Sequence, residues 1–106
     1  MTSIEICGEW SAWHDRMPGT TPTIHVTGAV RFRETGWNAE LQQRPFGINP
    51  KMLRLELVVT EVSETHADQP IEQEIHWQQD TDAELDQVEV FGEGFEGFVL
   101  DVVQTS

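Results

Sequence analysis

The sequence predicts an all-β domain, an antiparallel sandwich of about seven strands, with a barrel as the alternative. The clearest signal is residues 51–62 (KMLRLELVVTEV), where apolar and polar side chains alternate with the period of two of a pleated strand. Similar short segments recur along the chain, separated by glycine, proline and polar clusters. No stretch of about ten or more residues carries the apolar repeat of a helix.

The length and composition fit one domain that covers residues 1–106. A chain of this length can bury a core without disulfide or metal staples, which become usual only below about 40 residues. Hydrophobic residues make up 38% of the sequence and charged residues 24%, which is the balance of a globular protein rather than a disordered one.

The net charge of −13, from 19 acidic and 6 basic residues, limits the partners. Such a surface repels nucleic-acid phosphates and anionic membranes, so we expect neither nucleic acid nor membrane as a partner. No segment approaches the roughly 18 apolar residues of a membrane helix. The first residues lack the pattern of a secretion signal, and the single cysteine excludes an internal disulfide. We therefore expect a cytoplasmic protein.

The first two strands are predicted in residues 2–13 and 23–33. Residues 2–7 alternate, Gly8 can form a bulge, and the strand resumes through residues 9–13 with Trp10 and Ala12 on one face. Residues 14–22 (HDRMPGTTP) are typical of a loop. Residues 23–33 then place one apolar set on a single face: Ile24, Val26, Gly28, Val30 and Phe32.

The middle of the chain predicts a hairpin, a loop and the strongest strand. Residues 34–36 (ETG) form a turn in which Gly36 can take a positive φ, and residues 37–43 return with Trp37, Ala39 and Leu41 inward. Residues 44–50 (RPFGINP) are a loop. In residues 51–62 we expect one face inward, opposite or beside the apolar face of residues 23–33: Leu53, Leu55, Leu57 and Val59. The other face is only partly polar, and we expect the N-terminal tryptophans or a second chain to cover it.

The last third predicts three more strands. Residues 71–77 alternate with Ile71, Gln73, Ile75 and Trp77 on one face, after a polar connection over residues 63–70. Residues 78–86 (QQDTDAELD) form an acidic loop that can end in one helical turn. Residues 87–91 and 95–104 are the final strands, joined by a turn at 92–94. Apolar residues on both faces of FVLDVV indicate a central strand or one covered by another chain. This strand pattern is typical of an immunoglobulin-like or fibronectin-III-like sandwich.

The run GEGFEG at residues 92–97 has the spacing of a dinucleotide-binding loop. Its context predicts a hairpin turn instead, because it joins two strands and carries Glu93 and Glu96, which repel phosphate. The run and the all-β plan resemble the ApaG proteins, small bacterial domains with a fibronectin-III-like sandwich. That resemblance implies an interaction module loosely associated with divalent-cation homeostasis. The run differs from that of the family in being acidic and in lying later in the chain.

Metal and nucleophile patterns are weak. Asp80, Asp82, Glu84 and Asp86 alternate as oxygen ligands of calcium can, but the positions that an EF-hand requires are occupied by Leu85 and Phe91. A solvated acidic loop is the preferred interpretation. His25 and His76 converge only if their strands are neighbours, and paired or exposed histidines are the expected outcome. Cys7 is expected to be a buried structural thiol. We therefore predict no metal, no cofactor and no catalytic residues.

The tryptophans mark the best candidate surface. The sequence holds four tryptophans and no tyrosine. Trp37 and Trp77 are in phase with inward residues, whereas Trp10 and Trp13 fall on opposite faces of one strand. Trp10, Trp13 and His14 are therefore a candidate interaction surface. We expect a non-catalytic protein–protein interaction module, acting on a partner or as a homodimer. The alternative is a small-ligand or carbohydrate-binding domain that uses an exposed tryptophan.

Overall fold

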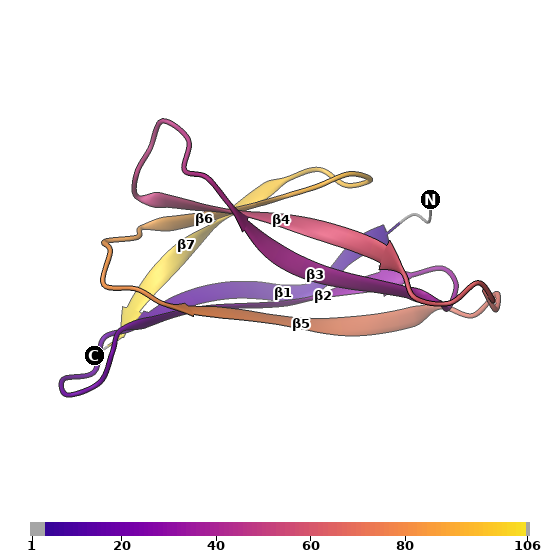
Figure 1. Ribbon diagram of the computed structural model, residues 1–106, viewed down its shortest axis with the longest axis horizontal. Coiled ribbons are helices and arrows are strands. Elements are labelled where there is room, and N and C mark those ends of the chain that lie inside the picture. The colour runs from indigo at the N-terminus through magenta and orange to yellow at the C-terminus, as the bar shows by residue number, and fades with distance from the viewer. Residues whose placement is uncertain (1–3, 106) are drawn as a thin grey trace.

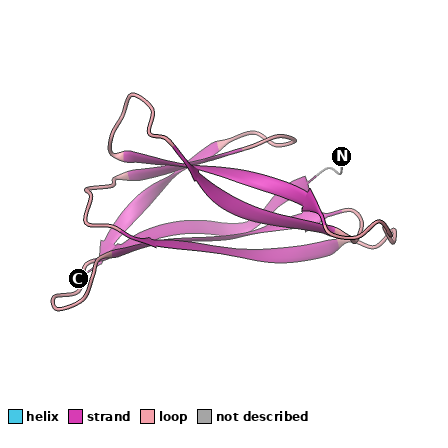
Figure 2. Ribbon diagram, in the orientation of Figure 1, coloured by secondary structure: helices cyan, strands magenta, loops and turns pink. Residues whose placement is uncertain are grey.

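The computed structural model describes residues 4–105, which form strands, turns and loops and no helix (Figure 2). The strands are β1 (Ile4–Asp15), β2 (Thr23–Phe32), β3 (Trp37–Arg44), β4 (Met52–Glu61), β5 (Ile71–Asp80), β6 (Gln87–Phe91) and β7 (Phe98–Thr105). The predicted all-β fold with about seven strands is thus confirmed. The predicted start of the first strand at residue 2 lies outside the described residues.

The seven strands form one mixed sheet in the order β3-β4-β6-β7-β1-β2-β5. Four neighbouring pairs are antiparallel. The pairs β1–β7 and β4–β6 are parallel, so the prediction of an antiparallel sheet is wrong. Turn residues show where a strand ends but not which strand it will pair with. After β5 the chain crosses to the other layer, where β6 runs beside β4 in the same direction.

The sheet folds over itself into two layers (Figure 1). Strands β1, β2 and β5 form one layer, β3, β4 and β6 form the other, and β7 runs obliquely between them. The first half of β7 pairs with β6 and its second half with β1, so β7 joins the layers. This confirms the prediction that the last strand is central. Its outward residues Val99 and Val103 are nevertheless exposed.

The predicted inward faces of the two strongest strands are confirmed. Leu53, Leu55 and Leu57 of β4 are buried, and Val59 packs against the core from a half-buried position. They meet the apolar face of β2 across the core, since the two strands lie in opposite layers (Figure 1). The buried residues of that β2 face are Ile24, Val26, Val30 and Phe32.

Ion pairs cover part of the outer face of β4, and the N-terminal tryptophans, one of the two predicted covers, do not. Arg54 Nε lies 2.9 Å from Glu89 Oε1, and its guanidinium group stacks 4.7 Å from the ring of Phe91. Glu56 pairs with Arg44 at 2.7 Å. The N-terminal tryptophans do not reach this face, because they belong to β1 in the other layer. Ion pairs over aliphatic stems therefore shield the partly apolar side chains of β4.

A single side chain bridges the two edge strands, β3 and β5. Gln73 Nε2 of β5 donates to Ala39 O of β3 at 2.8 Å and to Asn38 Oδ1 at 3.2 Å. Ala39 N in turn donates to Gln73 Oε1 at 2.9 Å. The side-chain amide thus makes the two bonds that a peptide group of a neighbouring strand would make, and it nearly closes the sheet into a barrel.

Three segment ends differ from the prediction by more than one residue. The loop predicted over residues 14–22 begins later, because His14 and Asp15 still pair with β2. Strand β5 continues to Asp80, three residues beyond the predicted end, through pairs with β2. Strand β7 begins at Phe98 rather than at residue 95. In each case pairing with a neighbouring strand, rather than local composition, sets the boundary.

Candidate functional site

The outward side of the layer formed by β1, β2 and β5 carries most of the candidate functional side chains. We call it the β1–β2–β5 face. Its residues alternate with inward-facing ones along each strand, so the same periodicity that builds the core also builds this surface. By this alternation and the pairing it comprises Glu5, Cys7, Glu9, Ser11, Trp13 and Asp15 of β1, Thr23, His25, Thr27, Ala29 and Arg31 of β2, and Glu72, Glu74, His76, Gln78 and Asp80 of β5.

The bulge in β1 sets which side chains reach this face. Gly8 has φ 68°, and the register with β2 shifts between Cys7 and Ser11, as the sequence predicts. Trp10 turns inward, and Gly28 leaves the space for its ring: a Cβ at Gly28 would lie 2.0 Å from Trp10 Cδ2. Trp10 Nε1 donates to Ala29 O at 3.1 Å. The indole is therefore anchored in the interior and not on the face.

An aromatic row crosses the face from β1 to β5. The rings of Trp13 and His25 stack with centroids 4.9 Å apart and an interplanar angle of 13°. The rings of His25 and His76 follow at 5.6 Å and 22°, and His25 Nδ1 lies 3.4 Å from His76 Nε2. Val103 of β7 pairs with Trp13 in the register and is 60% exposed, so apolar surface continues beyond the row.

Carboxylates lie on both sides of this row along the strands. Six of the residues of the face are acidic: Glu5, Glu9, Asp15, Glu72, Glu74 and Asp80. Its one arginine, Arg31, lies 3.7 Å from Glu5 and 3.5 Å from Glu72, so two carboxylates offset its charge. A shallow hollow of about 610 Å³ is lined by Glu9, Glu72, Glu74 and His76, among others. The face therefore combines aromatic area with an excess of negative charge.

Of the three residues predicted as an interaction surface, only Trp13 lies on this face. His14 is fully buried, and its Nε2 donates to Thr81 O at 2.8 Å, so its placement on a surface is wrong. The reason is its phase: His14 follows Trp10 and Ala12 on the inward side of β1. The Nδ1 atom of His14 has no hydrogen-bond partner among the described residues. Trp10 is half-buried and faces the core.

Cys7 is half-buried on the face rather than buried in the core as predicted. It pairs with Ala29 across the strands. Desolvation raises the pKa of its thiol, and the negative charge of Glu72 raises it further. A catalytic cysteine needs the opposite shift, toward thiolate.

His66 belongs to a second cluster, away from the face. Its Nδ1 donates to Thr35 O at 2.8 Å and lies 3.2 Å from Glu34 Oε2, while its Nε2 lies 2.7 Å from Glu61 Oε2. Its ring stacks on Trp37 at 4.9 Å. The Thr35 carbonyl and then the Glu61 carboxylate raise the pKa of His66. The cluster fastens the 62–70 connection to the turn before β3, where Gly36 has φ 93° as predicted.

The other sequence motifs have structural roles. The acidic residues of 80–86 do not converge, and among residues 4–105 no three metal-ligating side chains gather at one point. Leu85 within this loop is buried in the core, 2% exposed. The run 92–97 connects two antiparallel strands as predicted, with Gly94 at φ 88°.

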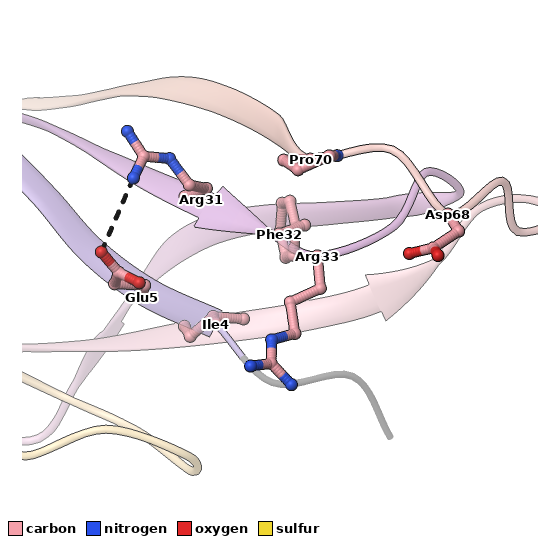
Figure 3. A pocket seen from close by; sticks show the side chains of 7 residues that line it. All are labelled: Ile4, Glu5, Arg31, Phe32, Arg33, Asp68 and Pro70. Atoms are coloured by element: carbon pink, nitrogen blue, oxygen red, sulfur yellow. Dashed lines mark ion pairs between the residues drawn. The ribbon is translucent and has the colours of Figure 1, made fainter.

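A second hollow, of about 690 Å³, lies where β1 begins and β2 ends (Figure 3). Ile4, Phe32 and Pro70 give it an apolar lining. Arg31 and Arg33 also line it, but their side chains point in different directions, and Arg31 turns toward Glu5 (Figure 3). The two guanidinium groups therefore do not converge on a single anion.

Comparisons with known proteins assign no function to this site. The chain matches no protein-family model, and neither the curated proteins nor the solved structures include a match. Within the described part of the chain, no helix is long or apolar enough to cross a membrane.

Proposed function

We propose that this chain is a non-catalytic interaction module and that its β1–β2–β5 face binds a basic segment of a partner protein. The observation that carries the proposal is the aromatic row of Trp13, His25 and His76, which carboxylates flank on both sides along the strands. A few residues contribute most of the binding energy at protein interfaces, and tryptophan and arginine are enriched among them. The raised pKa of Cys7 supports a binding role over a nucleophilic one.

The charge of the chain favours a basic partner over a second copy. The face carries six acidic residues, and the whole chain has a net charge of −13. Two such faces brought together would repel each other, whereas lysine or arginine side chains would find carboxylates and ring faces within reach. Homodimerisation through this face is therefore the less favoured form of the proposal.

An immunoglobulin-like or fibronectin-III-like sandwich remains the finer fold assignment that we propose. The two-layer arrangement of the strands supports it, while the two parallel strand pairs depart from its usual antiparallel pairing. The function does not depend on this assignment, because binding belongs to the surface and not to the fold.

An NMR titration tests the proposal. A lysine- and arginine-rich peptide should shift backbone resonances of the β1–β2–β5 face and the indole of Trp13, and an acidic peptide of equal length should not. Replacing Glu9, Glu72 and Glu74 by glutamine should weaken binding of the basic peptide by about tenfold or more, because charge-assisted contacts are lost.

A matched variant distinguishes binding to this face from a general effect of the net charge. Glu40, Glu84 and Glu93 are exposed residues of β3 and two loops, so replacing them by glutamine changes the net charge equally at a distance from the face. This variant should bind almost as tightly as the unmodified chain. Equal weakening in both variants, or no shifts on the face, would overturn the proposal.

The small-ligand or carbohydrate alternative has less support. Trp10 and Trp77 pack against the core and Trp37 stacks on His66, so Trp13 is left as the one candidate platform for a sugar, and His25 covers one face of its ring. The hollow in Figure 3 has no convergent polar groups. Tryptophan fluorescence that stays constant across a panel of sugars is the expected result, and a saturable change would favour the alternative.

A further inference from the structure

Two histidines on neighbouring strands point at each other across the β1–β2–β5 face. In the register of β2 and β5, His25 lies opposite Gln78 and His76 lies opposite Thr27, so the two residues are diagonal neighbours. His25 Nδ1 and His76 Nε2 are 3.4 Å apart. In this state one nitrogen donates its hydrogen to the lone pair of the other.

The distance between these nitrogens fits shared coordination of a metal ion. Zinc bonds imidazole nitrogen at about 2.0–2.1 Å in tetrahedral geometry, which places two ligand nitrogens about 3.3–3.4 Å apart. A square-planar ion with its ligands at right angles would need about 2.9 Å. The observed 3.4 Å agrees with the tetrahedral value. Zinc binding requires the donor imidazole to carry its hydrogen on its other ring nitrogen, and both rings to turn so that the two lone pairs meet at the ion.

The surroundings hold the pair in position and attract cations. The indole of Trp13 stacks on His25 at 4.9 Å and limits rotation of that ring. His76 is exposed and lines the hollow that also contains Glu9, Glu72 and Glu74. Their negative charge raises the local concentration of cations. These carboxylates do not act as ligands, because no third ligand converges with the histidine pair among the described residues.

We propose that His25 and His76 together bind one divalent transition-metal ion with tetrahedral preference, for which Zn²⁺ is the probe. The imidazole nitrogens supply two ligands, and water or a carboxylate from outside the chain fills the remaining positions. Trp13 is a positioning residue, since it contacts His25 and not the ion. This inference does not rest on the proposed basic partner, because metal binding requires only the two imidazoles.

Calorimetry and NMR on the whole chain test the metal site. Zn²⁺ should bind saturably, with one ion per chain, and should shift the ring resonances of His25 and His76. Changing His76→Ala or His25→Ala should each weaken binding by more than about tenfold, and Trp13→Leu by about tenfold. Because His76 is exposed, its replacement leaves the fold intact, which the unchanged backbone spectrum verifies.

Two controls make the result decisive. His66→Gln removes a histidine outside the face and should leave the affinity for Zn²⁺ unchanged. Ca²⁺ in excess should not displace Zn²⁺, because hard cations prefer oxygen ligands. The proposal is wrong if Zn²⁺ does not bind, if binding survives both His25→Ala and His76→Ala, or if Ca²⁺ displaces it and thereby shows that carboxylates alone hold the ion.

Discussion

Trp10 and Trp13 lie three residues apart in β1 and face opposite sides of the sheet. Trp10 uses the space above Gly28, where a Cβ would lie 2.0 Å from its ring. Trp13 instead stacks on His25 at the surface. The odd spacing predicts opposite faces, but only the Gly28 contact explains which tryptophan becomes part of the interior. The inward position of Trp10 thus depends on a glycine in the neighbouring strand.

Replacing Leu55 by alanine should lower the free energy of unfolding by about 2–5 kcal/mol. Leu55 is 0% exposed at the centre of β4, so truncation leaves a cavity against the opposite layer. Denaturant unfolding measures the loss. Val62→Ala is the matched control, because Val62 is 65% exposed and should cost less than about 0.5 kcal/mol. A loss of that small size at Leu55 would contradict the inward face assigned to β4.

The contribution of His66 to stability should fall as pH rises. Bonds to Thr35 O and Glu61 raise the pKa of His66 in the folded state above its unfolded value of about 6.5. The stabilisation is therefore complete below the unfolded pKa and is lost as pH rises through the raised folded pKa. Unfolding of the unmodified chain and of His66→Gln, compared at about pH 6 and pH 9, should differ more at the lower pH.

A second variant tests how much the carboxylate of Glu61 contributes to this pH dependence. With Glu61→Gln the imidazolium loses one carboxylate, so the pH dependence attributable to His66 should become smaller. A stability difference between His66→Gln and the unmodified chain that is equal at both pH values would show that the cluster acts only through packing on Trp37.

Cys7 should react slowly with a thiol reagent in the folded chain. Desolvation and then the charge of Glu72 raise the pKa of the thiol, and the thiolate is the reactive form. Glu72→Gln should speed labelling modestly, and denaturant should speed it strongly. Labelling of the folded chain as fast as that of the unfolded chain would contradict this assignment.

Among the elements, strands with one strictly apolar face were predictable from sequence. The alternation in β2 and β4 identifies their inward residues, since a shift of one position would expose every leucine. The ends of β1 and β5 were not predictable, because His14, Asp15 and residues 78–80 are polar and belong to strands only through their pairing with β2. Leu85 was missed because an isolated leucine in an acidic loop has no periodic neighbour.

The contact that Gln73 makes between β3 and β5 should be worth about 1–2 kcal/mol of stability. Gln73→Met keeps the size of the side chain but leaves Ala39 N and Ala39 O without their partner. Gln78→Met on the exposed side of the same strand is the control and should be nearly neutral. Denaturant unfolding compares the two variants, and hydrogen exchange at Ala39 N should accelerate only in Gln73→Met. Equal stability of both would show that the edges of β3 and β5 are held by other contacts.

At the scale of the whole molecule, strand pairing and the candidate site were only partly accessible from sequence. The composition predicts the acidic surface, and the phase of Trp13 places it outward. The meeting of His25 with His76 depends on β2 pairing with β5, two strands that are separated by β3 and β4 in the chain. No local pattern encodes that pairing, so from the sequence the two histidines meet only on the condition that their strands are neighbours.

The net charge of −13 should make stability rise with salt. Carboxylates repel one another in the folded chain, and ions screen this repulsion over a Debye length of about 10 Å at 0.1 M. Thermal unfolding in increasing sodium chloride should show a rising midpoint. Replacing exposed Glu64, Glu93 and Glu96 by glutamine should flatten the increase. A falling midpoint would instead show that attractive ion pairs such as Arg44 with Glu56 dominate.

The amide bridge at Gln73 also determines how copies of this chain would join if the bridge opened. Opening frees two different edges, β3 and β5, on one molecule. A contact between the β5 edge of one copy and the β3 edge of the next is head-to-tail and leaves a free edge at each end. Such contacts build rings or filaments according to the rotation between successive copies, so the loss of this one side chain would favour these assemblies over two-fold dimers.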